Sequence, residues 1–347
     1  MRNVLGNLIT LTLFGESHGP CIGGVLDGLP AGLEIDSEYI KSELDKRKSA
    51  PAISTPRREE DIPEFLSGVL NGRTEGTPVA FTIANGDVRS SDYEELAGIA
   101  RPGHADYSAE MRYGGFQDAR GGGHFSGRLT AALVTAGAIL KKALEDKGII
   151  IETHIYELAG IRDEDRMTAE IIKARDEGDS VGGILETVIL GLPAGVGEPS
   201  FSSVEAEISS AVFSIGGVKG IEFGAGFDIA RMKGSEANDE FAIEDGRVVT
   251  RSNNNGGING GITNGMPVVF RTAVKPTPSI SRKQKTVDFS GMEEVQIEIK
   301  GRHDPAIVHR AVACVDAAAA LTVADLLCLR YGSGYLLTKE DKTGGSK

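Results

Sequence analysis

Apolar and polar side chains alternate in the first part of the chain. Leu8–Phe14 is interrupted by Thr10 and Thr12, which gives the two-residue period of a half-buried strand. Runs rich in β-branched residues and bounded by turn residues predict further strands. The expected strands cover residues 8–14, 23–27, 79–83, 149–156, 183–190, 220–223, 268–274 and 295–300.

Other segments carry the three-to-four-residue period of amphipathic helices. The expected helices cover residues 37–46, 127–146, 169–177, 203–213 and 305–329. The two longest are rich in Ala and each follows a Gly- and Arg-containing loop, which suggests an internal pseudo-repeat. Their small side chains allow close approach, so we expect them to form a buried central layer. Strands and helices do not alternate strictly, so the pattern favours an α/β architecture of sheets packed on helices over a regular Rossmann fold or a TIM barrel.

Composition places the chain among ordinary globular proteins. It has 347 residues, of which 40% are hydrophobic and 25% charged, and no obvious linker divides it. We therefore expect a single domain over residues 1–347, with 342–347 as a flexible tail. We expect no apolar run of membrane length and no signal peptide, and thus a cytoplasmic protein. The net charge of −13 argues against a nucleic-acid surface and no metal-ligand spacing is present, while the three cysteines are expected to be buried thiols.

The segment from Arg120 to Arg128 contains three consecutive glycines and leads into an Ala-rich helical pattern. Backbone N–H groups at a helix N-terminus attract anions, and arginines can add charge-assisted hydrogen bonds to a phosphate. The simpler interpretation is that Ser126 caps the helix while the glycines turn the chain. Both interpretations stay open at this point.

Four histidines lie in loops beside Gly, Ser or Asp: His18, His104, His124 and His303. Imidazole titrates near neutral pH, so loop histidines are natural proton shuttles, although each alone is more often structural. Asp304 precedes Pro305 at the start of a helical pattern, which predicts a helix cap, and its carboxylate can also take part in proton chemistry.

Several motifs together resemble one known family. They are Gly15-Glu16-Ser17-His18-Gly19, Arg101-Pro102-Gly103-His104-Ala105-Asp106-Tyr107, the glycine segment with Ser126 and Arg128, the Asn/Gly loop of residues 251–265, Lys275-Pro276-Thr277-Pro278, and Gly301-Arg302-His303-Asp304-Pro305. In this order along nearly the whole chain they strongly resemble the chorismate synthases. The resemblance implies a sandwich of helices between β-sheets, a homotetramer, and trans-1,4-elimination of phosphate from 5-enolpyruvylshikimate 3-phosphate to give chorismate. That reaction is the last common step of the shikimate pathway to aromatic amino acids.

The resemblance also implies cofactors and residue roles. Reduced FMN is required but not consumed, and NADPH or a separate flavin reductase supplies the reducing equivalents. His18 is expected to protonate the departing phosphate and His104 to lie beside the flavin, while Ser17, Ser126 and Asp304 take part in proton transfer and flavin contacts. The expected FMN contacts are His124, Phe125, Ser126, Gly216, Gly217, Gly260, Lys275, Pro276, Thr277, Pro278, Ser279 and Arg302. The expected substrate-binding residues are Arg47, Arg57, Arg128 and Arg302, which would neutralise a phosphate and two carboxylates.

This chain departs from the family pattern at several positions. His124 stands where the family usually has Arg, Gly127 where it has Ala, and Gly216-Gly217 where it has Asn-Ala; the basic stretch after Lys46 lacks one position. Two alternatives follow. One is a catalytically weakened protein that binds FMN or a phosphorylated metabolite. The other is a flavin-dependent oxidoreductase, which would need a dinucleotide site, although no Gly-x-Gly-x-x-Gly follows an expected strand.

Overall fold

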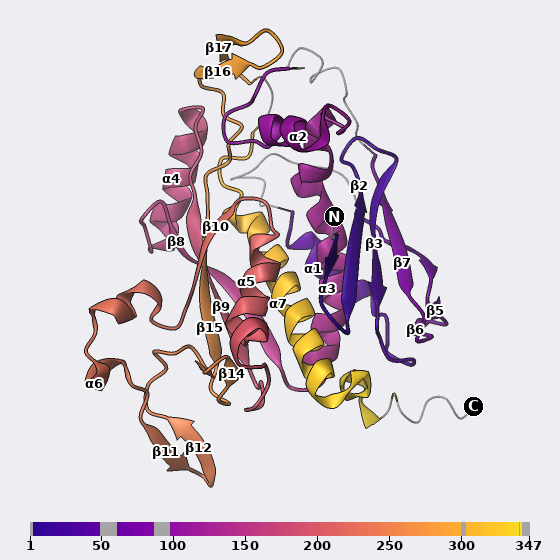
Figure 1. Ribbon diagram of the computed structural model, residues 1–347, viewed down its shortest axis with the longest axis vertical. Helices are drawn as coiled ribbons and strands as arrows, with labels where there is room; N and C mark the ends of the chain where they lie inside the picture. Colours follow the sequence, from indigo (N-terminus) through magenta and orange to yellow (C-terminus); the bar gives the residue numbers. More distant parts are fainter. Residues whose placement is uncertain (1–2, 49–60, 87–97, 300–302, 340, 342–347) are drawn as a thin grey trace.

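Two antiparallel sheets enclose a layer of helices in the computed structural model (Figure 1), which describes residues 3–48, 61–86, 98–299, 303–339 and 341. The first sheet has the order β1-β2-β3-β7-β4 and the second the order β10-β15-β9-β8. The strands of the first are Val4–Leu5 (β1), Thr10–Gly15 (β2), Cys21–Asp27 (β3), Val79–Ala84 (β7) and Glu64–Ser67 (β4). Those of the second are Val218–Phe223 (β10), Val268–Val274 (β15), Gly183–Leu190 (β9) and Ile150–Leu158 (β8).

The helical layer lies between the inner faces of the two sheets (Figure 1). It contains α1 (Ser37–Asp45), α3 (Thr130–Glu145), α5 (Val204–Phe213) and α7 (Val308–Tyr331). Helix α2 (Asp106–Tyr113) lies across one end of this layer, and α4 (Glu164–Asp176) connects β8 to β9. The expected α/β fold with helices sandwiched between sheets is confirmed.

Helices α3 and α7 pack against each other in the core. A Cβ atom added at Gly137 would lie 2.3 Å from the Cβ of Ala317, so only glycine permits this close approach. Beside this contact, Lys141 forms buried ion pairs with Asp316 at 2.6 Å and with Glu43 of α1 at 3.3 Å. The expected buried layer of small residues is therefore present, and it contains a paired ionic cluster.

Helix α7 corrects one expectation. Its 24 residues have a mean hydropathy of 2.0 over the most apolar window, which is long and apolar enough to cross a membrane, whereas the sequence analysis expected no such run. In the structure 89% of that window is buried inside the protein. Its apolar character is therefore that of a core helix packed against α3, α5 and the second sheet.

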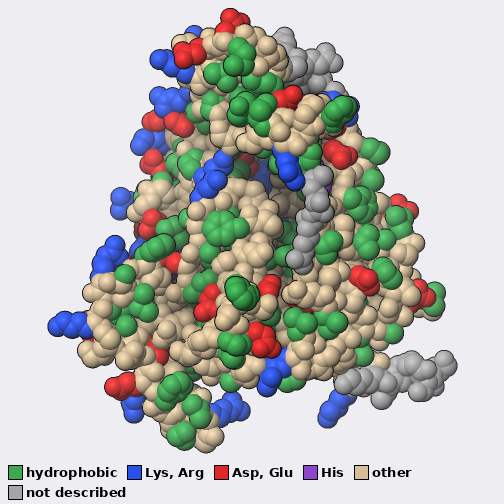
Figure 2. All heavy atoms as spheres, viewed as in Figure 1, with side chains coloured by type: hydrophobic (Ala, Val, Ile, Leu, Met, Phe, Trp, Pro, Cys, Tyr) green, Lys and Arg blue, Asp and Glu red, His purple; other side chains and the backbone are tan. Residues whose placement is uncertain are grey.

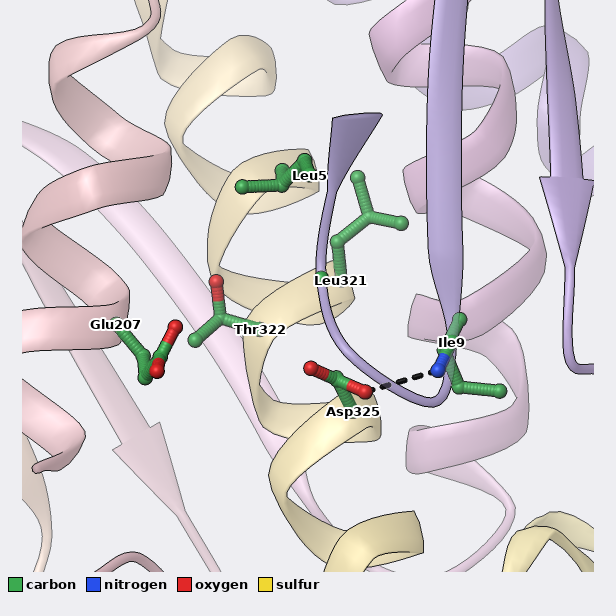
Figure 3. Close-up of a pocket in the computed structure, with 7 residues that line it drawn as sticks. Leu5, Ile9, Glu207, Leu321, Thr322 and Asp325 are labelled. Carbon is green, nitrogen blue, oxygen red and sulfur yellow. Dashed lines mark hydrogen bonds between the residues drawn. The ribbon is translucent and has the colours of Figure 1, made fainter. Parts of the chain in front are cut away.

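Asp325 of α7 binds the turn between β1 and β2 through hydrogen bonds (Figure 3). Its carboxylate accepts hydrogen bonds from the backbone N–H groups of Asn7 at 2.9 Å, Leu8 at 2.7 Å and Ile9 at 2.8 Å. These donors lie just before β2, where the chain turns from β1. A buried carboxylate is stable here because several N–H groups solvate it.

Apart from β1, the two sheets have the same topology. The first half runs β2-β3-α1-β4-β7-α3, and the second runs β8-β9-α5-β10-β15-α7 with α4 inserted. In each half a short hairpin precedes the last strand, which is β7 in the first half and β15 in the second. The hairpins are β5 (Val69–Leu70) with β6 (Arg73–Thr74), and β13 (Ile258–Asn259) with β14 (Ile262–Thr263).

Hydrogen bonds around these hairpins repeat as well. Thr74 Oγ1 donates to the carbonyl of Pro30 at 2.6 Å, and Thr263 Oγ1 donates to that of Pro193 at 2.6 Å. Both prolines lie in a Gly-Leu-Pro-Ala-Gly sequence. We propose that the chain is one domain built from two related halves.

Several elements differ from the sequence expectation. The expected strand at 295–300 is β17 (Glu293–Ile297), which pairs with β16 (Gln284–Asp288) in a hairpin outside both large sheets. The sequence analysis missed α2 and a hairpin of β11 (Phe241–Glu244) with β12 (Arg247–Thr250). The remaining short elements are α6 (Gly234–Ala237) and the 3₁₀ turns Arg120–Phe125, Gly127–Leu129, Ser200–Ser202, Gly226–Arg231 and Ser333–Leu336.

Candidate active site

The turn between β2 and β3 carries His18 and lies against the glycine segment that follows α2. Ser17 Oγ lies 3.2 Å from Nδ1 of His18 and donates to the carbonyl of Gly121 at 3.2 Å. The backbone N–H of Ser17 donates to the carbonyl of Gly123 at 3.2 Å. Two loops far apart in the sequence thus hold the His18 ring between them.

Gly121 is in direct contact with this ring. Its φ is +58°, and a Cβ atom added there would lie 2.0 Å from Cε1 and 2.1 Å from Nδ1 of His18. At Gly123, with φ +52°, a Cβ would lie 2.0 Å from the carbonyl oxygen of Asp118. These glycines therefore serve a close approach as well as a left-handed turn.

Asp61 joins two of the expected substrate-binding arginines. Its Oδ2 accepts from Nη1 of Arg47 at 2.7 Å, and its Oδ1 pairs with Nη1 of Arg128. The exposed fractions of the three side chains are only 11%, 6% and 8% for Arg47, Arg128 and Asp61, so the cluster is buried with an excess of one positive charge. Nε of Arg47 is buried and has no hydrogen-bond partner among the described residues. Such a cluster suits an anionic ligand.

Arg128 is further fixed by neutral acceptors. Its Nε donates to Oδ1 of Asn85 at 2.9 Å, and its Nη2 donates to the carbonyl of Ala84 at 3.0 Å. Asn85 also donates to the carbonyl of Gly19 at 2.8 Å in the His18 turn. Asp61 and Asn85 are site residues that the sequence analysis missed. Asp61 ends a stretch of charged residues, Arg57-Arg58-Glu59-Glu60-Asp61, whose sequence alone does not indicate a partner.

The rest of the glycine segment is occupied by local contacts. Ser126 Oγ accepts from the N–H of Arg128 at 3.3 Å, so the expected cap is present on the 3₁₀ turn that leads into α3. Arg120 pairs with Asp118 at 2.8 Å. His124 Nδ1 lies 2.9 Å from the carbonyl oxygen of Gly15, and the half-exposed Phe125 ring packs edge-on against Tyr113.

His104 precedes α2 and belongs to a second cluster. Its Nε2 lies 2.8 Å from Oγ of Ser279. Burial lowers the pKa of His104 to about 4, and the positive charge of Arg101 acts in the same direction while Asp106 opposes it. Arg101 itself pairs with Asp106 at 2.7 Å. His104 is therefore a neutral imidazole at neutral pH in the ligand-free protein.

The run from Lys275 to Ser279 follows β15 and packs closely on the His104 loop. Lys275 Nζ donates to the carbonyl of Gly103 at 2.6 Å, and a Cβ at Gly103 would lie 2.9 Å from the Cβ of Pro278. Oγ1 of Thr277 is buried and has no partner in the described part of the chain. A buried hydroxyl without a partner beside a cation is a feature of a ligand site.

The start of α7 differs from the expectation for Asp304. The helix begins at Val308 and has no side-chain cap, so the prediction that Asp304 caps it was wrong. Residues 305–307 form a turn before the helix, in which Oδ1 of Asp304 accepts from the N–H of Ala306 at 3.3 Å. Oδ2 pairs with Nε of Arg310 at 2.8 Å. Asp304 thus closes this turn onto the first turn of the helix.

Contacts through residues 180–181 connect this segment to the Lys275 run. The N–H of Val181 donates to the carbonyl of Pro305 at 2.9 Å, and Ser180 Oγ donates to the carbonyl of Thr277 at 2.7 Å. Gly217 joins the same region, since a Cβ there would lie 3.1 Å from Cδ1 of Ile307. Around the neighbouring Gly216 a Cβ would meet open space.

Gly260 is not brought to this region within one chain. It lies in the β13–β14 hairpin, beyond the end of β15 where Val268 pairs with Ile189, whereas Lys275 follows the other end. Seven strand residues separate these ends by about 20 Å. The expected residues Arg57 and Arg302 lie outside the described part of the chain.

The space-filling view shows the surface hollowed below α2, with Lys and Arg side chains at its rim (Figure 2). The acidic chain therefore presents positive charge around this hollow. Local cationic character of this kind favours a small anionic ligand.

Comparisons with known proteins agree on one family. The chorismate synthase family model matches residues 9–328. A chorismate synthase of Thermococcus kodakarensis is 47% identical over 345 residues, which cover 94% of this chain and 97% of that protein. One from Chitinophaga pinensis is 49% identical over 331 residues, covering 95% and 98%. A solved structure described as a crystal structure of chorismate synthase is similar with a TM-score of 0.73 and 28% identity over 94% of both chains.

Proposed function

This chain belongs to the chorismate synthase family, and from that premise we propose how its residues perform the family's reaction. The activity is that of a carbon–oxygen lyase: 5-enolpyruvylshikimate 3-phosphate loses phosphate and one ring proton, and chorismate forms. One C–O bond and one C–H bond break, and a second ring double bond forms. The protein must therefore bind a substrate with one phosphate and two carboxylates, assist the leaving phosphate and accept a ring proton.

His18 is the proposed proton donor to the departing phosphate. The observation that carries this role is the packing of its ring between the Ser17 turn and Gly121. Asn85 connects this turn to the buried arginine cluster, because it donates to the carbonyl of Gly19 and accepts from Nε of Arg128. A proton donor contributes to rate when its geometry is fixed before the substrate arrives. Ser17 orients the ring through the contact at Nδ1.

Arg47 and Arg128 are proposed to neutralise anionic groups of the substrate. Both guanidinium groups already lie in one buried cluster, so little side-chain entropy is lost on binding. Each terminal guanidinium nitrogen carries two protons, so a nitrogen that contacts Asp61 can donate to a further acceptor. Positive charge fixed near the leaving group also stabilises the charge that develops on it.

The residues of the His104 cluster fit an FMN molecule. Gly216 leaves open space, the buried Thr277 Oγ1 has no described partner, and Lys275 offers a cation. When bound, reduced FMN supplies an electron-rich ring that favours loss of phosphate without net redox change. Before the cofactor binds, His104 is a neutral hydrogen-bonding group. A nearby anion on the bound cofactor would favour its protonation. Ser126, His124 and Phe125 would approach the cofactor from the glycine segment.

Further properties of the enzyme are proposed with it. NADPH or a separate flavin reductase would supply reducing equivalents, and the cytoplasm suits its three free thiols. A homotetramer is supported by the β11–β12 hairpin, where Phe241, Ile243 and Val248 are 65%, 71% and 60% exposed. Apolar faces of this kind on two-stranded hairpins are usually covered by another surface. Size-exclusion chromatography with light scattering would measure the assembly.

The activity is tested by anaerobic incubation of the purified protein with 5-enolpyruvylshikimate 3-phosphate and chemically reduced FMN. Chorismate and phosphate should appear in equal amounts with reduced but not with oxidised FMN, and no net flavin oxidation should occur. The His18→Ala variant should be slower by about 10²-fold or more while keeping the wild-type unfolding midpoint. Flavin binding without either product would indicate a binding protein instead.

A further inference from the structure

Lys219 occupies a β-bulge at the edge of the candidate flavin site. In the β10–β15 ladder, Val218 pairs with Val274 and Gly220 pairs with Ala273, so Lys219 has no residue opposite it. A bulge of this kind bends the strand and changes the direction of the extra side chain. Here it sits at the end of β10 that borders the expected FMN contact Gly217.

The bulge brings Lys219 next to Lys275. The N–H of Lys275 donates to the carbonyl of Gly217 at 2.9 Å, so the chain segments that carry the two lysines are hydrogen-bonded at this point. Burial lowers the pKa of Lys275, and the charge of Lys219 lowers that pKa further, as expected for two neighbouring ammonium groups. The segments thus hold like charges together at an energetic cost.

No carboxylate compensates this cost within the part of the chain that the structure describes. Lys275 Nζ donates to the carbonyl of Gly103, and Lys219 is exposed without an ion pair among those residues. Cations in neighbouring segments behave differently: Arg101, Arg120 and Arg282 pair with aspartates at 2.7 to 2.8 Å. In a protein with a net charge of −13, two adjacent lysines that lack acidic partners indicate an external anion.

We propose that Lys219 and Lys275 form a subsite for a phosphate monoester, the group that FMN and the substrate both carry. The Lys219 contribution is the new element, and the inference rests on the proposed function. A phosphate can accept hydrogen bonds from both ammonium groups and relieve their repulsion. The bulge is therefore the local feature that supplies the second cation to the Lys275 run.

The test compares ligands with and without the phosphate. Oxidised FMN and riboflavin are titrated into wild-type protein and into Lys219→Met by flavin fluorescence, and 5-enolpyruvylshikimate 3-phosphate is titrated by calorimetry. If the subsite holds the flavin phosphate, Lys219→Met should weaken FMN binding roughly tenfold to a hundredfold and leave riboflavin unchanged. If it holds the substrate phosphate, the same loss should appear for the substrate alone. Lys219→Arg should recover most of the affinity in either case.

Lys233→Met is the matched control, because it removes one exposed lysine on the remote α6 arm. It should bind all three ligands as the wild type does. Unchanged affinity of Lys219→Met for both FMN and substrate would overturn the subsite while leaving the proposed function intact. Wild-type protein that binds neither ligand would overturn the proposed function. In that case the subsite is tested by the rise of the unfolding temperature that inorganic phosphate causes. Wild-type protein should show this rise and Lys219→Met should not.

Discussion

Replacing Gly121 by alanine tests whether the glycine segment exists to hold the His18 ring. The new Cβ would lie 2.0 Å from Cε1 of His18, whereas ordinary contacts begin at 3.4 Å. The ring must therefore move by about 1.4 Å or the segment must shift by the same amount. The fold itself depends little on this surface segment, so the main effect should be on the geometry of the catalytic group.

The size of the effect follows from two separate contributions. A misplacement of about 1 Å of a catalytic group can cost about 10²-fold in rate, so Gly121→Ala should lose at least that much turnover. The left-handed backbone, with φ +58°, adds roughly 1–2 kcal/mol of destabilisation for any residue with a Cβ. Stability and turnover should therefore change by very different amounts.

Gly122→Ala separates the two contributions. Gly122 also has a positive φ, +85°, but the nearest atom to its added Cβ is 4.0 Å away, on Ser126. Both variants should unfold at similarly reduced urea concentrations, while turnover in the anaerobic chorismate assay should fall far more in Gly121→Ala. Equal turnover in the two variants, or wild-type turnover in Gly121→Ala, would refute the proposed role of the contact.

Buried ionisable groups give three further predictions. Asp61→Asn removes the carboxylate between two buried guanidiniums, so urea melts should show a loss of roughly 3–5 kcal/mol, part of which inorganic phosphate restores; an unchanged midpoint would contradict the pairing. The pKa of His104 is lowered to about 4, so as the pH falls the unfolded chain binds a proton at this residue before the folded chain does. The contribution of His104 to the free energy of unfolding is therefore full above about pH 6.5 and is lost as the pH falls toward 4. His104→Gln should remove this dependence, which amounts to at most about 3 kcal/mol. If the unfolding free energies of the variant and the wild type fall in parallel over this pH range, the prediction is wrong. Asp325→Asn should lower the unfolding free energy by about 2–3 kcal/mol because backbone donors lose a charged acceptor, whereas turnover should be retained; lost turnover at full stability would be inconsistent with a purely structural role.

The regular elements could be predicted where periodicity and burial agree. The strands at 183–190 and 268–274 were predicted with their observed bounds, because each is flanked by turn residues and packs one face on the core. Helix α2 was missed because Ala109 is its only buried residue among eight, so it has almost no apolar period. The hairpin at 241–250 was missed although Asp245-Gly246 is a strong turn signal at its centre.

The candidate site was only partly visible in the sequence. Loop histidines and glycines could be named because their residue types suggest chemistry on their own. The contact of Gly121 with His18 and the pairing of Asp61 with Arg47 depend on chain segments that meet only in the folded protein. The same holds for Lys219, whose direction is set by a bulge that exists only in the ladder between β10 and β15. Asp304 was assigned to the right segment but to the wrong cap, since three residues of turn separate it from α7.

The repeated topology explains why these segments meet. In each half, the connection from the last strand to the long helix carries site residues. The His104 loop and the glycine segment lie between β7 and α3, and residues 275–304 lie between β15 and α7. The connection between the first two strands also contributes in each half: a turn that carries His18 in one, and the segment after α4 that carries Ser180 in the other. Because α3 and α7 pack together in the core, the loops that precede them are brought to the same end of the helical layer. Both histidines belong to the first half, but Ser279 and Lys275, which contact the His104 loop, belong to the second. The His104 cluster can therefore form only when the two halves fold as one unit.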